Sequence, residues 1–182
     1  MSKYKYNNES HITISELMLP SHSNFSGKIH GGYILSLMDQ IAFACAAKYS
    51  GYYAVTASVD KVDFLQPIEV GELVTMKASV NFVGRSSMVV GVRVESENIT
   101  SGSKKHCNSS YFTMVAKDDN GKTVAVPGLI LEDDESIRRF VRSASRQQQG
   151  KIRRAKFSSS TFKISEHMEI LNDYNVKVEL KK

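Results

Sequence analysis

The chain has 182 residues, of which 41% are hydrophobic and 24% charged, with 11 Gly and 3 Pro. This composition is that of an ordinary globular domain, and it excludes collagen-like, low-complexity and wholly disordered chains. The formal net charge of +5 suggests a nucleic-acid or membrane-surface partner, unless the charge is confined to one part of the chain.

The positive charge is in fact confined to one short segment. Residues 1–137 hold 12 basic and 15 acidic side chains, a net −3, whereas residues 138–156 hold 8 basic side chains and no acidic one. Residues 157–182 hold four of each sign. This distribution argues against a nucleic-acid partner for the main part of the chain. A solvated basic helix face is the simpler interpretation, and an arm for nucleic acid or an acidic membrane is the alternative.

No targeting or metal-binding pattern is present in the sequence. The first eight residues contain no apolar core of a signal peptide, and no apolar run approaches the length of about 20 residues that a membrane span needs. Cys45 and Cys107 are isolated, so we expect neither a disulfide framework nor a metal site. These features predict a cytoplasmic location.

The first predicted element is a strand at residues 12–19. Its apolar alternation slips out of phase before Leu17, which predicts a bulge. Pro20 ends this strand, and residues 20–32 are rich in turn-forming residues and predict a loop.

A buried helix and four strands are predicted next. The apolar run at 33–49 is too long for a strand and is apolar on nearly all faces, so it predicts a buried helix with Gly51 as its C-cap. The segments that follow are rich in Val, Thr, Tyr and Phe and are separated by turn formers, which predicts an antiparallel sheet. The four predicted strands span 52–65, 71–83, 86–98 and 104–116.

The last predicted helix spans 133–149 and is amphipathic, with Asp133 or Asp134 as its N-cap. Its apolar side chains recur with helical spacing at Ile137, Phe140, Val141 and Ala144. Residues 150–182 have no clear period and predict a tail with one strand near 176–180. One sheet covers only one side of the buried helix, so we expect a second copy of the chain to cover another side.

Residues 24–39 carry the most specific pattern in the chain. The run from Asn24 through Gly31-Gly32 to Met38-Asp39 resembles the N-x-x-G-x-x-x-G-G…M-D signature of hotdog-fold acyl-CoA thioesterases. The branch it resembles contains bacterial broad-specificity acyl-CoA hydrolases and the mammalian brain acyl-CoA hydrolase. Further matching segments lie at 56–64, 67–68, 84–88, 119–122 and 126–128.

The resemblance implies an α+β hotdog fold, in which an antiparallel sheet wraps around a long buried helix, plus a C-terminal amphipathic helix. The implied organisation is an N-terminal segment at 1–10, a thioesterase domain at 11–149 and an extension at 150–182. The implied reaction is hydrolysis of acyl-CoA to free fatty acid and CoA. The resemblance implies no cofactor, because CoA is part of the substrate and of the product. A homodimer is the implied catalytic unit, within a homohexamer built as a trimer of dimers.

Asp39 is the strongest candidate for the chemistry. It is the only acid between residues 17 and 59, and a carboxylate in an apolar helix is costly unless it is paired or functional. With the resemblance, we assign Asp39 as general base or nucleophile, and the sequence does not separate these roles. A carboxylate held by a structural hydrogen bond is the plainer alternative.

The glycines before the helix predict an oxyanion site formed by the backbone N–H near Gly32, with Gly31 as a substrate contact. First-turn amides of a helix are unpaired and carry partial positive charge, and Gly31 and Gly32 allow close approach of a carbonyl. Gly32 and Asp39 lie about 10 Å apart along one helix face. We therefore expect Asp39 of one protomer to act with the loop of the other. Glycines that only shape the loop are the alternative.

Two loop residues are secondary candidates. By resemblance, Asn24 polarises the thioester carbonyl or positions water, although a loop Asn more often only forms an Asx turn. His30 beside the glycines resembles the His of hotdog dehydratases, but it lacks their partner acid arrangement, so we give it a minor substrate-binding role.

The Gly84-Arg85-Ser86-Ser87 turn is the candidate CoA contact. Arg85 offers a planar fork for phosphate, and the serine hydroxyls add hydrogen bonds. Ser58 is assigned to the lining of the site, together with Thr56. A solvated hairpin is the alternative for the turn.

Two other functions on this fold remain open from the sequence. One is a 3-hydroxyacyl thioester dehydratase, and the other is a non-catalytic acyl-CoA-binding module.

Overall fold

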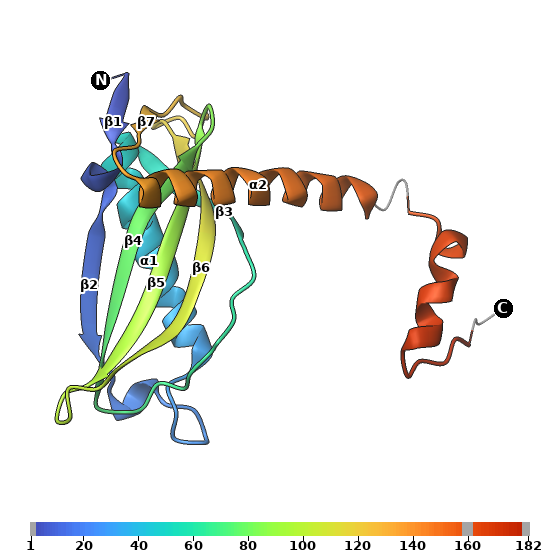
Figure 1. The fold of residues 1–182 in the computed structure, drawn as a ribbon, viewed down its shortest axis with the longest axis horizontal. Coiled ribbons are helices and arrows are strands. Elements are labelled where there is room, and N and C mark those ends of the chain that lie inside the picture. Colours follow the sequence, from blue (N-terminus) through green and yellow to red (C-terminus); the bar gives the residue numbers. More distant parts are fainter. Residues whose placement is uncertain (1–2, 158–161, 180–182) are drawn as a thin grey trace. The chain divides into compact units, whose positions relative to one another are not determined.

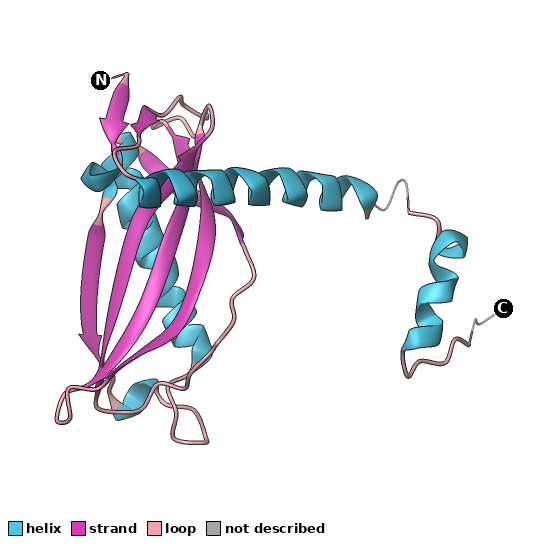
Figure 2. Cartoon of the chain, in the orientation of Figure 1, coloured by secondary structure: helices cyan, strands magenta, loops and turns pink. Residues whose placement is uncertain are grey.

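The computed structural model describes residues 3–157 and 162–179 (Figures 1 and 2). The chain divides into two compact units, with the boundary in the sequence after Ser143. The first unit holds a five-stranded antiparallel sheet in the order β2-β4-β5-β6-β3. The strands are β2 (Ile12–Leu17), β3 (Tyr53–Val59), β4 (Glu72–Val83), β5 (Ser87–Asn98) and β6 (Lys104–Lys117). Figure 1 shows the sheet curling around one long helix, which confirms the predicted α+β arrangement.

That helix is α1 (Gly31–Ser50), and it begins two residues before the predicted start. Its buried residues include Met38, Ile41 and Cys45, which pack against the inward-facing Val, Met and Phe side chains of the strands. Gly51 ends it with a φ of 75°, a left-handed conformation that glycine adopts without steric cost, as the sequence predicts. Burial raises the pKa of the Cys45 thiol to about 12, so this cysteine is an inert part of the core.

The strands alternate as the sequence predicts, with two local differences. In β2 the pairing with β4 is continuous, so the predicted bulge is wrong. The apparent slip has another cause: Leu17 faces solvent, and Met18, just after the strand, returns to the core. β3 ends at Val59, whereas the prediction runs to residue 65. Residues 60–66 form no strand, although Leu65 still donates a backbone hydrogen bond to β6 at Cys107.

A parallel two-stranded pair lies at one end of the first unit and was not predicted. It joins β1 (Tyr4–Tyr6) to β7 (Gly128–Ile130). The hydroxyl of the buried Tyr49 donates a 2.7 Å hydrogen bond to the carbonyl of Gly128, which ties the pair to α1. Three-residue strands separated by more than a hundred residues leave no periodic signal in the sequence. Short 3₁₀ helices lie at Asn7–Ser10 (η1) and Pro20–His22 (η2).

Helix α2 (Asp134–Lys156) begins in the first unit and continues into the second. Asp133 caps it, because its Oδ1 accepts a 2.7 Å hydrogen bond from the amide of Ser136. Near this end, the ring of Phe140 contacts Phe82 on the sheet face opposite α1, at 5.2 Å between centroids. The helix runs seven residues beyond its predicted end. The predicted boundary between the thioesterase domain and the C-terminal extension, at residue 149, therefore falls inside this helix. It stays a prediction.

The second unit contains the rest of α2 and a 3₁₀ segment, η3 (Ile164–Asp173). The prediction of a strand near 176–180 is wrong for the residues that the structure describes there, since 176–179 form no strand. Among the described residues, no helix is both long enough and apolar enough to cross a membrane.

The core supplies a first prediction, based on two phenylalanines with opposite environments. Phe112 on β6 is completely buried, whereas Phe25 in the loop before α1 is fully exposed. Phe112→Ala should lower the free energy of unfolding by about 3–5 kcal/mol, because it leaves a cavity in a packed core. Phe25→Ala should change it by less than about 0.5 kcal/mol. Urea denaturation at one fixed protein concentration measures both, and equal losses would contradict this description of the core.

Candidate active site

The loop before α1 is organised by Asn24. Its Oδ1 accepts hydrogen bonds from the amide of Ser26 (2.9 Å), the hydroxyl of Ser26 (2.7 Å) and the amide of Lys28 (3.2 Å). These backbone donors fix which end of the side-chain amide is the oxygen. The Nδ2 group is exposed and makes no hydrogen bond within the described chain. Asn24 therefore forms an Asx turn and at the same time presents two free N–H donors.

His30 is the N-cap of α1. Its Nδ1 accepts a 3.0 Å hydrogen bond from the amide of Gly32, which satisfies one of the unpaired first-turn donors. The imidazole must therefore carry its proton on Nε2 in this arrangement. A carbonyl oxygen can reach the Gly32 amide only if the His30 ring moves away.

Gly31 has a different environment from its neighbour. Its amide has no hydrogen-bond partner among the described residues. A Cβ at this position would lie 3.1 Å from the ring of Phe64, so the absence of a side chain allows the loop after β3 to approach the helix start. The unpaired first-turn amide at this end of α1 is thus that of Gly31.

Asp39 lies in the middle of α1 and is held by one residue of the sheet. The hydroxyl of Thr56 on β3 donates a 2.7 Å hydrogen bond to Asp39 Oδ1. Asp39 Oδ2 makes no hydrogen bond within the described chain. One carboxylate oxygen is therefore oriented by the protein, and the other is available for chemistry.

The surroundings of Asp39 are apolar and partly open. Leu35 and Phe43 lie one turn before and after it and are 36% and 37% exposed, so the three residues form a stripe along the side of α1 next to β3. Phe43 also contacts the ring of Tyr53, which is 63% exposed at the start of β3. Among the strands that the structure describes, β3 pairs with β6 alone, which leaves its other edge without a partner there.

Ser58 lies two residues beyond Thr56, but the register of β3 shifts between these residues. A regular strand would place both side chains on one face; the shift alters this relation locally. Ser58 is half-buried, and its hydroxyl makes no hydrogen bond within the described chain.

The Gly84-Arg85-Ser86-Ser87 turn joins β4 to β5. The Gly84 amide donates to the Ser87 carbonyl (2.7 Å), and the Arg85 carbonyl accepts from the Val126 amide (3.0 Å). The Arg85 side chain is exposed. A Cβ at residue 84 would lie 2.7 Å from Ser87 Oγ, so a larger residue there would require the Ser87 side chain to move.

The structure brings some candidates together within one chain and separates others. The Ser86 carbonyl accepts a hydrogen bond from the amide of Ala116, and Ala116 on β6 pairs with Ala54 on β3. The turn therefore lies near the start of β3. At the other end, Lys28 forms an isolated β-bridge with Glu69, and the amide of Ile29 donates a hydrogen bond to the carbonyl of Ile68. Both partners lie just before β4. The length of β4, about 36 Å, separates this end from the turn. One end of the fold thus holds Asn24, His30, Gly31 and Gly32. The pair of Asp39 and Thr56 lies toward the other end, since Thr56 pairs with Met114, and Met114 pairs with Met88 just after the turn.

The sequence indicates Thr56 only as a lining residue of the site. A threonine in a strand is common, and nothing local in the sequence shows which side chain will face an acid 17 residues earlier. Among the described residues no group of three His, Cys, Asp or Glu is placed to hold a metal ion.

Comparison with known proteins identifies the family. Residues 26–103 match the thioesterase superfamily. The chain is 41% identical to the Helicobacter pylori protein VdlD over 137 residues, which cover 75% of this chain and 78% of VdlD. It is 38% identical to YkhA of Bacillus subtilis, described as an uncharacterised acyl-CoA thioester hydrolase, over 71% of this chain and 75% of that protein.

Solved structures agree with these relatives. A hexameric acyl-CoA thioesterase, determined without ligand, matches 84% of this chain and 98% of its own, with 35% identity and a TM-score of 0.82. The acyl-CoA hydrolase of Staphylococcus aureus, solved with butyryl-CoA and CoA, matches 93% and 99% with 32% identity and a TM-score of 0.78. The chain therefore belongs to the thioesterase superfamily, among the acyl-CoA thioester hydrolases. The predicted family, the hotdog fold and the enzyme class are confirmed.

Three further structures of the S. aureus enzyme carry single alanine substitutions. They replace an asparagine, an aspartate and a threonine at positions 28, 43 and 60 of that chain. Each position is four higher than Asn24, Asp39 and Thr56, the same three residue types in the same order. The three residues that the geometry marks here thus have the spacing of the three residues substituted there.

The cap on α1 supplies the second prediction. His30→Ala removes the acceptor of the Gly32 amide and should lower the free energy of unfolding by about 1 kcal/mol. His30→Asn keeps a capping oxygen and should retain most of that stability. Thermal unfolding of both variants measures the difference, and equal melting temperatures for the two variants would contradict a capping role for the imidazole.

Proposed function

We propose that the protein hydrolyses fatty acyl-CoA to free fatty acid and CoA with Asp39 as the central catalytic group. The observation that carries this proposal is the carboxylate on an otherwise apolar stripe, oriented by Thr56 and open at Oδ2. Membership of the acyl-CoA thioester hydrolases and the matched spacing of the three substituted residues support it.

Two forms of the chemistry use the same atom. As a general base, Oδ2 takes a proton from water as the water oxygen attacks the thioester carbon; the C–S bond then breaks, and the CoA sulfur leaves as a thiolate that takes up a proton. As a nucleophile, Oδ2 attacks the carbon itself, the C–S bond breaks and the CoA thiolate leaves and takes up a proton. Water then hydrolyses the resulting anhydride to the fatty acid and the Asp39 carboxylate. The hydrogen bond from Thr56 orients the carboxylate in either case.

The developing negative charge on the thioester oxygen needs hydrogen-bond donors. Asn24 Nδ2 and the amide of Gly31 have no hydrogen-bond partner among residues 3–157 and 162–179, and they lie at the same end of the fold. The amide of Gly32 can join them if substrate displaces the His30 ring. Preorganised donors of this kind contribute about 3–4 kcal/mol each where they have been removed from other enzymes.

We propose that one complete site is built from two chains. The unpaired edge of β3 and the exposed stripe of Leu35, Asp39 and Phe43 are adjacent, so a second copy can cover both. Two β3 strands paired about a two-fold axis run antiparallel. Such pairing places the start of β3 in one copy beside the end of β3 in the other.

This pairing would unite the separated candidates. The Arg85 turn lies near the start of β3, and Gly31 lies beside Phe64, which follows the end of β3. The Asn24 loop of one copy would thus lie near the Arg85 turn of the other, with an Asp39 between them. Arg85 and the serines of its turn would then contact CoA phosphates, and Ser58 would line the site at the interface.

The proposed assembly beyond the dimer is based on structurally similar thioesterases. Two of the matched thioesterase structures are described as hexameric. We propose a homohexamer made of three such dimers for this chain. A cytoplasmic location stays a prediction.

Dehydration of a 3-hydroxyacyl thioester has less support than hydrolysis as the reaction of this protein. His30 is engaged as a helix cap and has no acidic partner within the described chain. A dehydratase would leave the thioester intact, so release of free thiol from acyl-CoA separates the two reactions. A binding module without activity would also release no thiol.

The third prediction concerns the catalytic pair. Asp39→Ala should lower the rate of thiol release from acyl-CoA by at least about 100-fold, because the proton acceptor or nucleophile is lost. Thr56→Val keeps the side-chain shape but removes the donor, and it should cost about tenfold. Gln40→Ala, at the next position on the helix, serves as the control and should retain the wild-type rate. Turnover of Asp39→Ala at the wild-type rate would refute the assignment.

The fourth prediction tests the shared site. Asn24→Ala should lower turnover by less than Asp39→Ala does. When the two variants are unfolded and refolded together in equal amounts, random pairing leaves about a quarter of the sites with both side chains intact if the site spans two chains. The mixture should therefore recover about a quarter of wild-type activity, measured by thiol release. Activity equal to the mean of the separately refolded variants would place Asn24 and Asp39 in the same chain's site.

A further inference from the structure

We propose that His22 and Tyr33 are positioning residues for the reaction, because their stacked rings fix the Asn24 loop against the start of α1. The inference rests on the proposed function, in which Asn24 Nδ2 and the amide of Gly31 receive the charge on the thioester oxygen. Neither ring supplies one of those donors. Both rings act through the backbone that they hold in place.

Two backbone hydrogen bonds and one ring contact form a closed circuit at this end of the chain. The amide of His30 donates a 2.9 Å hydrogen bond to the carbonyl of His22, and the amide of Tyr33 donates one of the same length to the carbonyl of His30. The rings of His22 and Tyr33 close the circuit, since they stack with 4.0 Å between their centroids and 21° between their planes. Such stacks contribute energy beyond the area that they bury. The end of η2 is therefore tied to the first turn of α1 by main chain and side chain together.

The circuit is anchored to the sheet through Tyr33, whose hydroxyl donates a hydrogen bond to Oε1 of Glu16 on β2. Alternation along β2 places Glu16 on the same face as Ile12 and Ile14, which pack against the core. The carboxylate is half-buried there and needs a donor. The hydrogen bond to Glu16 raises the pKa of Tyr33, so the hydroxyl remains a protonated donor at neutral pH. Tyr33 is thus held by a ring from η2 and by a carboxylate from β2.

The Asn24 loop begins and ends at this circuit. Ser23 and Ile29 form an antiparallel bridge, so the loop between them is a short hairpin. The residues that flank the hairpin are His22 and His30, and both are members of the circuit. The circuit therefore sets where the hairpin, and with it the Asn24 side chain, lies relative to α1.

The two rings lie on the side of α1 away from the proposed oxyanion donors. Positions 31 and 33 are about 200° apart around a helix, so Tyr33 faces β2 whereas Gly31 faces Phe64 after β3. A change in either ring leaves Asp39 and the donors chemically intact. It alters instead the separation between Asn24 Nδ2 and the amide of Gly31. Donors stabilise a transition state fully only when their spacing is fixed in advance.

The fifth prediction uses two substitutions of His22, in the full-length protein, that remove different parts of its side chain. His22→Phe keeps a ring for the stack but loses Nδ1, which accepts a 3.3 Å hydrogen bond from the Leu19 amide. His22→Asn loses the ring but keeps an acceptor. His22→Asn should lower kcat for thiol release about fivefold with KM within about twofold, whereas His22→Phe should keep the wild-type kcat. Tyr33→Leu removes the other ring and should match His22→Asn.

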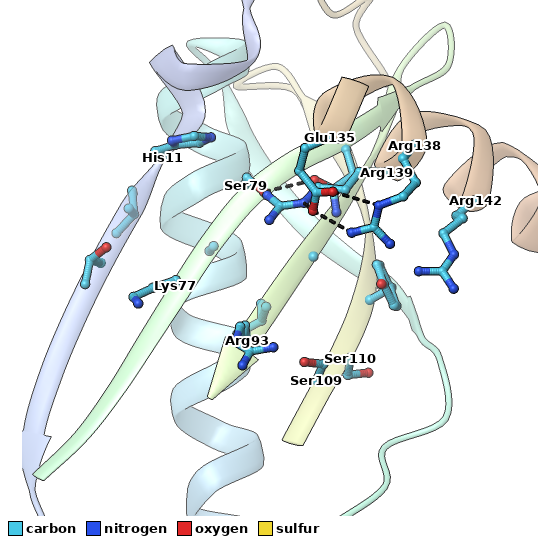
Figure 3. A pocket seen from close by; sticks show the side chains of 17 residues that line it. His11, Lys77, Ser79, Arg93, Ser109, Ser110, Glu135, Arg138, Arg139 and Arg142 are labelled. Atoms are coloured by element: carbon cyan, nitrogen blue, oxygen red, sulfur yellow. Dashed lines mark hydrogen bonds and ion pairs between the residues drawn. The ribbon is translucent and has the colours of Figure 1, made fainter. Parts of the chain in front are cut away.

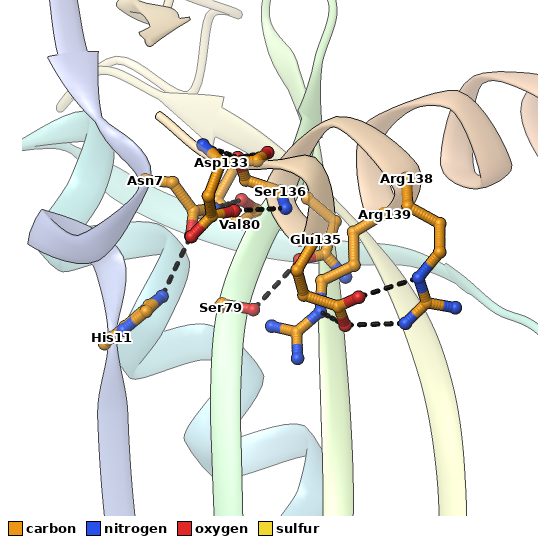
Figure 4. Close-up of polar contacts among 10 residues, drawn as sticks. Asn7, His11, Ser79, Val80, Asp133, Glu135, Ser136, Arg138 and Arg139 are labelled. Atoms are coloured by element: carbon orange, nitrogen blue, oxygen red, sulfur yellow. Dashed lines mark hydrogen bonds and ion pairs between the residues drawn. The ribbon is translucent and has the colours of Figure 1, made fainter. Parts of the chain in front are cut away.

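A double variant tests whether the ring acts through Asn24. Asn24→Ala already lacks the donor that the circuit positions, so adding His22→Asn should lower kcat by less than about twofold more. Independent losses would instead multiply. Asp133→Ala, which removes the cap at the start of α2 (Figure 4), is the control for a loss of stability alone. It should lower the melting temperature and leave kcat at the wild-type value.

Amide hydrogen exchange separates this proposal from the catalytic one, because it does not depend on the reaction. The hydrogen-bonded amides of Asn24, Gly27 and Lys28 should exchange about fivefold faster in His22→Asn than in the wild type, and at the wild-type rate in His22→Phe. Absence of thiol release by the wild type would refute the proposed function and leave this measurement intact. The positioning role is overturned if His22→Asn keeps the wild-type kcat or multiplies the loss of Asn24→Ala. It is also overturned if the two His22 variants have equal exchange rates in the loop.

Discussion

The packing of α1 against the concave face of the sheet is the constraint on which the other features depend. A helix with apolar residues on nearly every side can be covered by one sheet only in part, and Met38, Ile41 and Cys45 occupy the covered part. With 3.6 residues per turn, positions 35, 39 and 43 then fall on the side next to β3 that remains open. The same geometry that buries the core thus presents one carboxylate between two apolar side chains.

An acid in this position is acceptable only with a partner. A charge removed from water costs several kcal/mol unless hydrogen bonds replace its hydration, and covering the stripe with a second chain would remove much of that water. Thr56 supplies one such bond from the adjacent strand. Because Thr56 lies on the edge strand, the residue that orients the carboxylate and the edge available for pairing belong to the same element. Catalysis and association are therefore difficult to separate in this fold.

The sequence predicts those features that depend on neighbours along the chain. The caps at Asp133 and Gly51, the long helix and most strand ends follow from periodicity and turn chemistry. Features formed by residues far apart were missed, such as the pairing of β1 with β7 and the contact between Thr56 and Asp39. The predicted strand near 176–180 failed for the reverse reason: alternation there is present, but the described residues have no neighbouring strand to pair with. The candidate residues themselves came from the motif, whereas their division between two ends of the fold required the structure.

The distribution of charge has a structural explanation for the first part of the basic segment. Arg138, Arg139 and Arg142 lie in the turns of α2 that pack on the sheet, where two acids are already shared by four cations. A helix that merely kept its arginines in water would gain nothing from placing them over further cations, and like charges at close range repel by about 1 kcal/mol even in high dielectric. The sheet below could have carried acids at these outward positions but carries Ser79, Gly91 and Ser109 instead. The carboxylates of Glu95 and Glu135 therefore balance only part of the positive charge over this face of the described chain (Figure 3).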